Sequence, residues 1–104
     1  MITNRQEQLA ALRTTLEQQF ERHTLELTKL TIARSGPERA GYDRETVPAL
    51  IASTRQALAD TTQALRRVAE GQYGTCERCQ SEIPLERLEI RPHARFCVPC
   101  QQTR

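Results

Sequence analysis

Apolar side chains recur every three or four residues along the first third of the chain. With one histidine among them, they stand at steps of 3, 4, 4, 3, 4 and 3, at Leu9, Leu12, Leu16, Phe20, His23, Leu27 and Leu30. This spacing is close to that of the a and d positions of a coiled coil. No proline or glycine interrupts residues 1–35. The pattern therefore predicts a helix over about residues 4–34, with Thr3 or Asn4 as its N-cap and Glu7 completing a capping box with Asn4.

A second stripe of the same kind follows after a short break. Its steps alternate between 4 and 3, at Val47, Ile51, Thr54, Leu58, Thr61, Leu65 and Val68. Thr46 suits the N-cap of such a helix, Pro48 suits its first turn, and Gly71 suits its end. The sequence predicts a second helix that begins near Val47 and ends before Gly71.

The segment Ser35-Gly36-Pro37 separates the two stripes. Because neither helix can hide its apolar stripe alone, we expect an antiparallel hairpin with a tip loop near residues 35–46. The alternative is that the stripes pack against a partner or a second copy; we expect a monomer rather than a homodimer. The polar seam residues His23, Thr54 and Thr61 should lower stability while fixing the register. The first helix is the longer one, so its N-terminal end should run alongside the C-terminal module.

Four cysteines form two close pairs in that module, Cys76-x2-Cys79 and Cys97-x2-Cys100. Each pair can place two sulfurs on one tight turn, and the seventeen intervening residues, 80–96, suit paired zinc knuckles. The sequence predicts one structural Zn²⁺ with these four ligands, which leave no open position for water or substrate. Two disulfides, a redox motif and an iron–sulfur centre are the alternatives. We expect His93, between the pairs, to be a surface residue and no ligand.

Composition agrees with a mainly α protein in two parts, a hairpin over 1–71 and a four-cysteine zinc finger over 72–104. The apolar share is 38% and the aromatic share 4%, with no tryptophan. The finger has too few large apolar residues to fold alone, so metal binding should supply much of its folding energy, ~10 kcal/mol or more. The predicted division therefore separates a helical part from a metal-dependent part.

Charge and hydropathy exclude several classes of function. The formal net charge is +2, and a zinc tetrathiolate would bring it to about zero, so we expect no sequence-specific nucleic-acid binding. No apolar run could span a membrane, and the N-terminus lacks the apolar core of a signal peptide. We therefore expect a cytoplasmic protein. The sequence contains neither a recognisable nucleophile–base pair nor an open metal position, so we expect that the protein is not an enzyme.

The second half of the chain resembles the DksA/TraR family of zinc-finger proteins. The resemblance runs from about Ala64 to Gln101 and includes residues other than the cysteines, namely Tyr73-Gly74, Ile83, Arg87-Leu88, Arg91-Pro92 and Ala94. It implies a factor that binds bacterial RNA polymerase by inserting its coiled-coil tip into the secondary channel, often together with the alarmone ppGpp. It implies no catalysis by the factor itself. The alternative is a zinc-stapled coiled-coil interaction module without polymerase activity.

The tip departs from the pattern of that family. The best-known members carry Asp-x-x-Asp-x-Ala there, whereas this chain has three acidic residues at another spacing: Glu38, Asp43 and Glu45. These three are the candidate polymerase-contacting residues, although a solvated turn would also account for them. A second departure is Gln80, which replaces the usual glycine after the first cysteine pair. A left-handed backbone turn at Gln80 would be strained.

Overall fold

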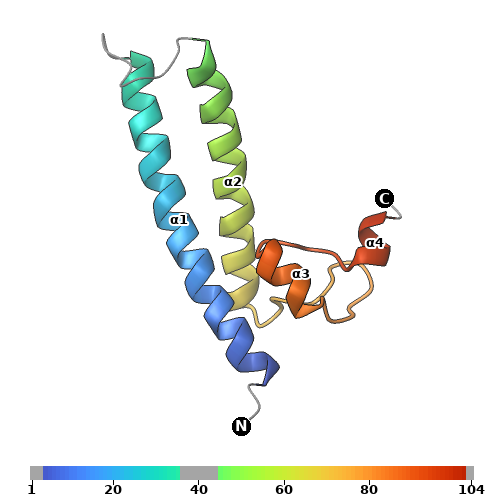
Figure 1. Ribbon diagram of the computed structural model, residues 1–104. Helices are drawn as coiled ribbons and strands as arrows, with labels where there is room; N and C mark the ends of the chain where they lie inside the picture. Colours follow the sequence, from blue (N-terminus) through green and yellow to red (C-terminus); the bar gives the residue numbers. More distant parts are fainter. Residues whose placement is uncertain (1–3, 36–44, 103–104) are drawn as a thin grey trace.

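The structure, a computed structural model, describes residues 4–35 and 45–102. Along the chain come α1 (Arg5–Ser35), α2 (Thr46–Ala69), α3 (Leu85–Ile90) and α4 (Val98–Gln102) (Figure 1). The long helices α1 and α2 run antiparallel, and the small finger with α3 and α4 lies beside the end of the hairpin that is far from the tip. Residues 4–35 and 45–102 form no strand, only one isolated antiparallel bridge between Thr75 and Glu82. The predicted fold class, a helical hairpin followed by a small finger, is confirmed.

The start of α1 and the end of α2, which lie at the finger end of the hairpin, are both capped as the sequence predicts. At the start of α1, the backbone N–H of Asn4 donates to Glu7 Oε1 (3.1 Å), and that of Glu7 donates to Asn4 Oδ1 (2.8 Å). This is a capping box. At the end of α2, Gly71 has a φ of +75°. The N–H groups of Gly71 and Gln72 donate to Val68 O (3.1 Å) and Arg67 O (2.8 Å), which is a Schellman motif.

The predicted N-cap of α2 is wrong. Thr46 is the first helical residue, and Glu45 precedes it with φ −77° and ψ −23° and no side-chain capping bond. A capping threonine needs an extended backbone. Thr46 instead lies within the first turn, where its hydroxyl cannot reach the orphan N–H groups. Pro48 removes one of those N–H groups, so the missing cap leaves fewer donors unpaired.

The seam between α1 and α2 follows the predicted stripes with two local differences. Near the tip, Leu30, Val47 and Ile51 form a buried cluster, and Leu16 is fully buried further along. Phe20 remains 38% exposed. The two successive four-residue steps from Leu12 through Leu16 each advance 40° beyond a full turn, which carries Phe20 to the margin of the seam.

On α2 the buried side shifts toward the finger end. Ala64 is buried, whereas the predicted seam residue Leu65 is only partly so. Leu65 follows Val47 by five full turns and so lies on the same side of the helix, whereas Ala64 lies about 100° around it. Thr61 is buried, as expected for a seam residue, and its hydroxyl donates to Ala57 O (2.9 Å). The polar seam position is thereby satisfied within its own helix.

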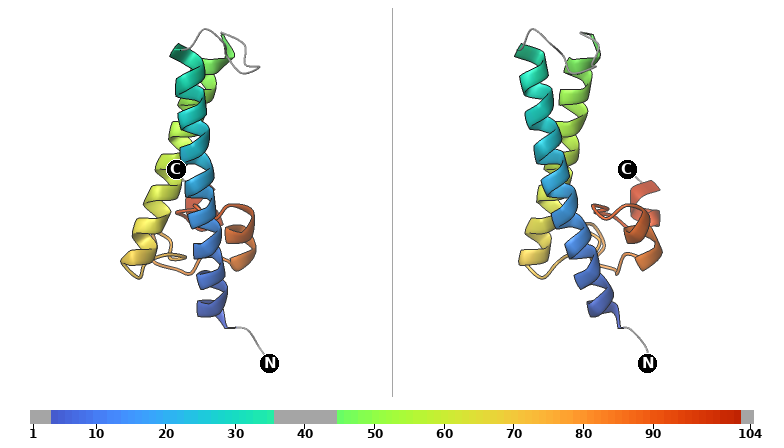
Figure 2. Two further views of the ribbon diagram at one scale, coloured as in Figure 1. Left: turned by 90° about the vertical axis from the view of Figure 1, so that its left-hand side faces the viewer. Right: turned by 60° about the vertical axis from the view of Figure 1, so that its left-hand side comes forward.

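The N-terminal end of α1 runs past the end of α2 and along the finger, as predicted (Figure 2). Arg5 Nη2 donates to Gly74 O (2.9 Å) and Ile83 O (2.8 Å). Leu12 joins a buried cluster with Cys76, Ile83, Leu88 and Cys97. One helix therefore belongs to two cores, pairing with α2 near the tip and with the finger near its own start. The division of the chain at residues 71 and 72 stays a prediction.

Replacing Leu16 by alanine tests the importance of the seam. Leu16 is fully buried, so the substitution should lower the free energy of unfolding by about 2–5 kcal/mol, measured by urea denaturation of the zinc-loaded protein. Leu25→Ala is the matched control, a leucine of the same helix that is largely exposed. Its effect should stay within about 0.5 kcal/mol. Equal losses for both variants would contradict the observed seam.

Candidate metal centre

The first cysteine pair lies on a tight turn closed by backbone hydrogen bonds. Cys76 N donates to Ser81 O (2.8 Å), and Gln80 N donates to Cys76 O (3.0 Å). Inside the turn, the N–H groups of Arg78 and Cys79 point toward Cys76 Sγ, at 3.4 and 3.5 Å. The backbone thus orients one sulfur before any metal binds.

The second pair is positioned by a helix. Cys97 directly precedes α4, Cys100 lies within it, and Gln101 N donates to Cys97 O (2.9 Å). The helical turn brings both sulfurs of the pair to one side. The two pairs face each other, with Cys79 Sγ 3.7 Å from Cys97 Sγ.

All four sulfurs fit one tetrahedral Zn²⁺. The ligand atoms of Cys76, Cys79, Cys97 and Cys100 lie within 4.8 Å of one another. A Zn–S bond of ~2.3 Å with tetrahedral angles requires sulfurs about 3.8 Å apart, and the observed 3.7 Å between Cys79 and Cys97 agrees. Cys76 and Cys97 are buried, whereas Cys79 is exposed. Among the described residues no other group of three or more potential ligands is this close.

The thiols differ in acidity because their surroundings differ. Burial opposes ionisation of Cys76, but hydrogen bonds from backbone N–H groups outweigh it and lower its pKa to about 6. The hydroxyl of Ser81, 3.2 Å away, lowers the pKa of Cys79. Contact with the Cys97 sulfur, then burial, raises the pKa of Cys100 to about 12. Four sulfurs this close cannot all ionise on their own, and a divalent cation supplies the missing positive charge.

The backbone after the first pair is left-handed. Gln80 has a φ of +69° and is the one residue other than glycine with a positive φ among the described residues. The sequence predicted strain here if the turn were left-handed, and the turn is left-handed. A side chain in this region costs about 1–2 kcal/mol relative to glycine, which the surrounding turn and metal must offset.

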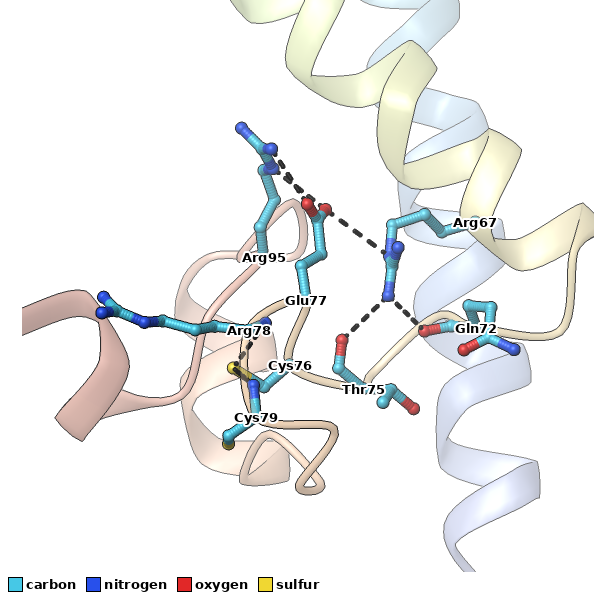
Figure 3. A network of polar contacts seen from close by, with 8 residues as sticks. All are labelled: Arg67, Gln72, Thr75, Cys76, Glu77, Arg78, Cys79 and Arg95. Carbon is cyan, nitrogen blue, oxygen red and sulfur yellow. Dashed lines mark hydrogen bonds and ion pairs between the residues drawn. The ribbon is translucent and has the colours of Figure 1, made fainter. Parts of the chain in front are cut away.

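Two arginines, one from each long helix, hold the finger on the hairpin through backbone carbonyls. Arg5 of α1 binds Gly74 O and Ile83 O, and Arg67 Nη2 of α2 donates to Gln72 O (3.2 Å) and Thr75 O (3.0 Å) (Figure 3). These carbonyls lie directly before or after the first cysteine turn. The hairpin therefore orients the segment that carries the metal ligands.

Glu77, the residue after Cys76, joins the hairpin to the second half of the finger. Arg95 forms a two-pronged pair with it, Nε to Oε2 at 3.0 Å and Nη2 to Oε1 at 2.9 Å. Arg67 Nε lies 3.7 Å from the same carboxylate (Figure 3). The hydrogen bond from Arg95 lowers the pKa of Glu77. Such paired, charge-assisted hydrogen bonds fix orientation as well as adding energy.

Two further contacts close the finger. Gly74 has a φ of +85°, and a Cβ there would meet Leu9 at 3.1 Å and Arg5 Nη2 at 3.2 Å. Its bare backbone lets α1 approach. Tyr73 donates its hydroxyl hydrogen to Pro92 O (2.7 Å), and burial raises its pKa to about 12. The family resemblance includes Tyr73 and Gly74, but the sequence alone indicates no role for either residue.

Of the other predicted residues, the structure places two. His93 lies at the surface, as expected, with its side chain 36% exposed and its Nε2 3.9 Å from Asp60 Oδ2 on α2. Burial lowers the pKa of His93. It does not join the cysteine group. Glu45 is exposed and directly precedes α2. Glu38 and Asp43 lie outside the described residues.

The fold and the site together define a class: a four-cysteine zinc finger docked on an antiparallel helical hairpin. Residues 71–104 match the model of the prokaryotic DksA/TraR C4-type zinc finger. This segment is therefore a zinc finger of the DksA/TraR C4 type, and the chain carries one structural zinc, for which the four clustered cysteines are the available ligands. This decides between the alternatives that the cysteine spacing left open.

The similarity to curated proteins covers about half of this chain. The chain is 41% identical over 59 residues to general stress protein 16O of Bacillus subtilis, covering 57% of this chain and 36% of that protein. It is 46% identical over 48 residues to the RNA polymerase-binding transcription factor DksA of Caulobacter vibrioides, covering 46% and 34%. The matched segments thus span about a third of these relatives.

A solved structure extends the similarity of the fold to the hairpin. The transcription factor DksA2 from Pseudomonas aeruginosa matches with a TM-score of 0.75 and 24% identity, covering 92% of this chain and 81% of that chain. At this identity the match shows the fold alone. The search for membrane spans over the described residues found no helix long and apolar enough to cross a bilayer.

Replacing Gln80 by glycine should stabilise the finger. Glycine adopts the left-handed backbone freely, so we expect the free energy of unfolding to rise by roughly 0.5–1 kcal/mol, measured by denaturation with zinc present. Gly71→Ala is the converse control, since Gly71 is also left-handed but a Cβ there would touch nothing. It should lower stability by about 1 kcal/mol through backbone strain alone. A Gln80→Gly protein less stable than the parent would disprove strain at this turn.

Removing zinc should unfold the finger and leave much of the hairpin helical. Helices α1 and α2 hold 31 and 24 residues, whereas α3 and α4 hold 6 and 5. Circular dichroism at 222 nm after chelation should therefore keep most of its amplitude, while the dispersed amide signals of residues 72–102 collapse in NMR spectra. Cys97→Ser should reproduce this without chelator. Complete loss of the helical signal would show that the hairpin cannot fold without the metal.

Proposed function

We propose that this protein is a transcription regulator that binds bacterial RNA polymerase, with the tip of its helical hairpin inserted into the secondary channel. The observation that carries the proposal is the finger, which is of the DksA/TraR C4 type and docks on a hairpin with the fold of DksA2. One relative is named an RNA polymerase-binding transcription factor. The polymerase would place the protein in the cytoplasm.

The geometry supports such a role. Helix α2 has 24 residues and so extends about 36 Å, and the whole molecule measures 53 × 34 × 22 Å. A narrow rod with the finger at one end can reach into a channel while the finger stays outside. In this proposal the zinc, bound by Cys76, Cys79, Cys97 and Cys100, has a structural role, because four protein ligands leave no position for a reacting group. The factor is then no enzyme.

The same proposal includes the residues that contact the polymerase and a small-molecule ligand. The acidic tip residues Glu38, Asp43 and Glu45 would contact the polymerase. The alarmone ppGpp would act jointly with the polymerase, and a concave surface of about 240 Å³ offers positive charge for its phosphates, since Arg87, Arg91 and Arg95 line it. Asp60 lines the same surface and offsets part of that charge. The charges near the finger therefore allow an anion but do not by themselves select one.

In vitro transcription with tip variants tests the proposal. Asp43→Ala and Glu45→Ala should reduce the effect of the protein on promoter complexes at least about fivefold, which is ~1 kcal/mol of lost coupling. Glu70→Ala is the matched control, since it removes an exposed acidic residue at the opposite end of α2. It should behave as the parent. Parallel reactions with ppGpp test the joint action of the alarmone.

A photo-crosslinker at position 45 gives an independent measurement. It should link the protein to the largest subunits of the core polymerase, at peptides that line the secondary channel. If no polymerase crosslink forms, and the parent protein leaves transcription unchanged, the proposal is wrong. The remaining reading would then be a zinc-stapled coiled-coil interaction module without polymerase activity.

A further inference from the structure

Glu77 lies inside the first cysteine turn, between Cys76 and Cys79, but its side chain points away from the cysteine sulfurs (Figure 3). The carboxylate is directed toward α2 and toward the second half of the finger, where Arg67 and Arg95 meet it. The side chain of Glu77 is only 18% exposed. A carboxylate withdrawn from water to this extent needs charged partners. The turn that carries two metal ligands therefore also carries an acidic group that is held from outside the metal site.

Arg67, in the last turn of α2, binds three acceptors in the segment that leads into the metal site. Its Nη2 donates to the carbonyl oxygens of Gln72 (3.2 Å) and Thr75 (3.0 Å), and its Nε lies 3.7 Å from Glu77 Oε2. The side chain of Arg67 is 20% exposed. A guanidinium group is planar and rigid, so acceptors bound to it are fixed relative to one another. One residue of the hairpin thereby fixes the course of residues 72–77.

Glu77 also connects the two cysteine pairs. Its backbone N–H donates to Arg95 O (2.9 Å), and its carboxylate accepts two hydrogen bonds from the guanidinium of the same arginine. Arg95 stands two residues before Cys97, so these contacts help to set the distance between the first cysteine turn and the second pair. Zinc requires its four sulfurs about 3.8 Å apart. Glu77 thus helps to hold the separation that the metal needs, and Arg67 holds Glu77.

We propose that Arg67 is a positioning residue for the zinc site, which raises the affinity of the protein for zinc by acting through Glu77. None of the hydrogen bonds of Arg67 among the described residues reaches a cysteine. When Arg67 holds Glu77 and the carbonyls before it, less conformational freedom remains to be lost as the sulfurs close around the ion. A coupling between two sites is reciprocal, so zinc that orders residues 72–77 also stabilises the last turn of α2.

Competition with a chelator measures the affinity for zinc. Arg67→Gln should bind zinc at least about fivefold more weakly than the parent protein. Arg66→Gln is the matched control, because Arg66 precedes Arg67 in the same turn of α2, is exposed and loses the same charge. Its affinity should stay within about twofold of the parent. An unchanged affinity of Arg67→Gln would overturn the inference, and so would equal losses in both variants.

A double-mutant cycle tests the route through Glu77. Glu77→Gln keeps the shape of the side chain but removes its charge, and it should also weaken zinc binding. If the two residues act as one unit, the double variant of Arg67→Gln and Glu77→Gln should bind zinc more tightly than the product of the two single losses predicts. Losses that simply multiply would show independent effects and would overturn the inference.

Amide hydrogen exchange tests the reverse direction of the coupling. In the parent protein, zinc should slow exchange in the last turn of α2, residues 66–69, much more than in residues 50–55 near the tip. In Arg67→Gln saturated with zinc, this additional protection of residues 66–69 should be lost, although the four sulfurs still bind the ion. Equal protection in the variant and the parent would show that the metal orders α2 by another route, which would overturn the inference.

Discussion

The coordination of one cation by four sulfurs is the interaction on which the finger depends. Residues 72–102 bury few large apolar side chains, chiefly Ile83 and Leu88, too little to order a segment of this length. The cysteines are brought so close that their charges oppose one another. Zinc offsets that repulsion and supplies most of the folding energy, because the ligand set is not assembled in the unfolded chain and binding the metal is also folding the finger.

The metal is only indirectly coupled to the hairpin, and the coupling uses backbone carbonyls. Arg5 and Arg67 reach from different helices to the carbonyls that flank the first cysteine turn, and Glu77 carries the contact on to Arg95. Backbone acceptors can be held in this way only where the chain is already ordered. The zinc therefore orders the acceptors, and the arginines convert that order into a fixed angle between finger and hairpin. Leu12 of α1 adds an apolar contact between the hairpin and the finger.

The two long helices, the first cap and the zinc site could be predicted from the sequence, because each leaves a local pattern of residues along the chain. The heptad steps gave α1 and α2, the Asn4–Glu7 pair gave the first cap, and the cysteine spacing gave the zinc site. The N-cap at Thr46 was wrong because the chain enters α2 already in a helical conformation. Phe20 was misjudged because two successive four-residue steps carry it to the margin of the seam, and Leu65 because the buried side of α2 shifts to Ala64.

The contacts between the finger and the hairpin could not have been predicted in the same way. The donors Arg5 and Arg67 meet carbonyls, which every residue possesses, so no partner residue type marks the contact in the sequence. The contact of His93 with Asp60 could not have been predicted either, because Asp60 belongs to another element. The resemblance to a family indicated that Tyr73 and Gly74 mattered, but their roles came only from the contacts with Pro92, Leu9 and Arg5.

The hydrogen bonds of Arg5 have a consequence for the order of folding. They join residues 69 and 78 positions apart along the chain, so the beginning of the protein is bound only after the hairpin has turned and the finger has formed. Local helix formation and metal binding can each proceed without this contact, whose closure in the unfolded chain would carry a large loop entropy. The N-terminal turn of α1 therefore binds the finger last, and it is the part of the contact between finger and hairpin that should open first.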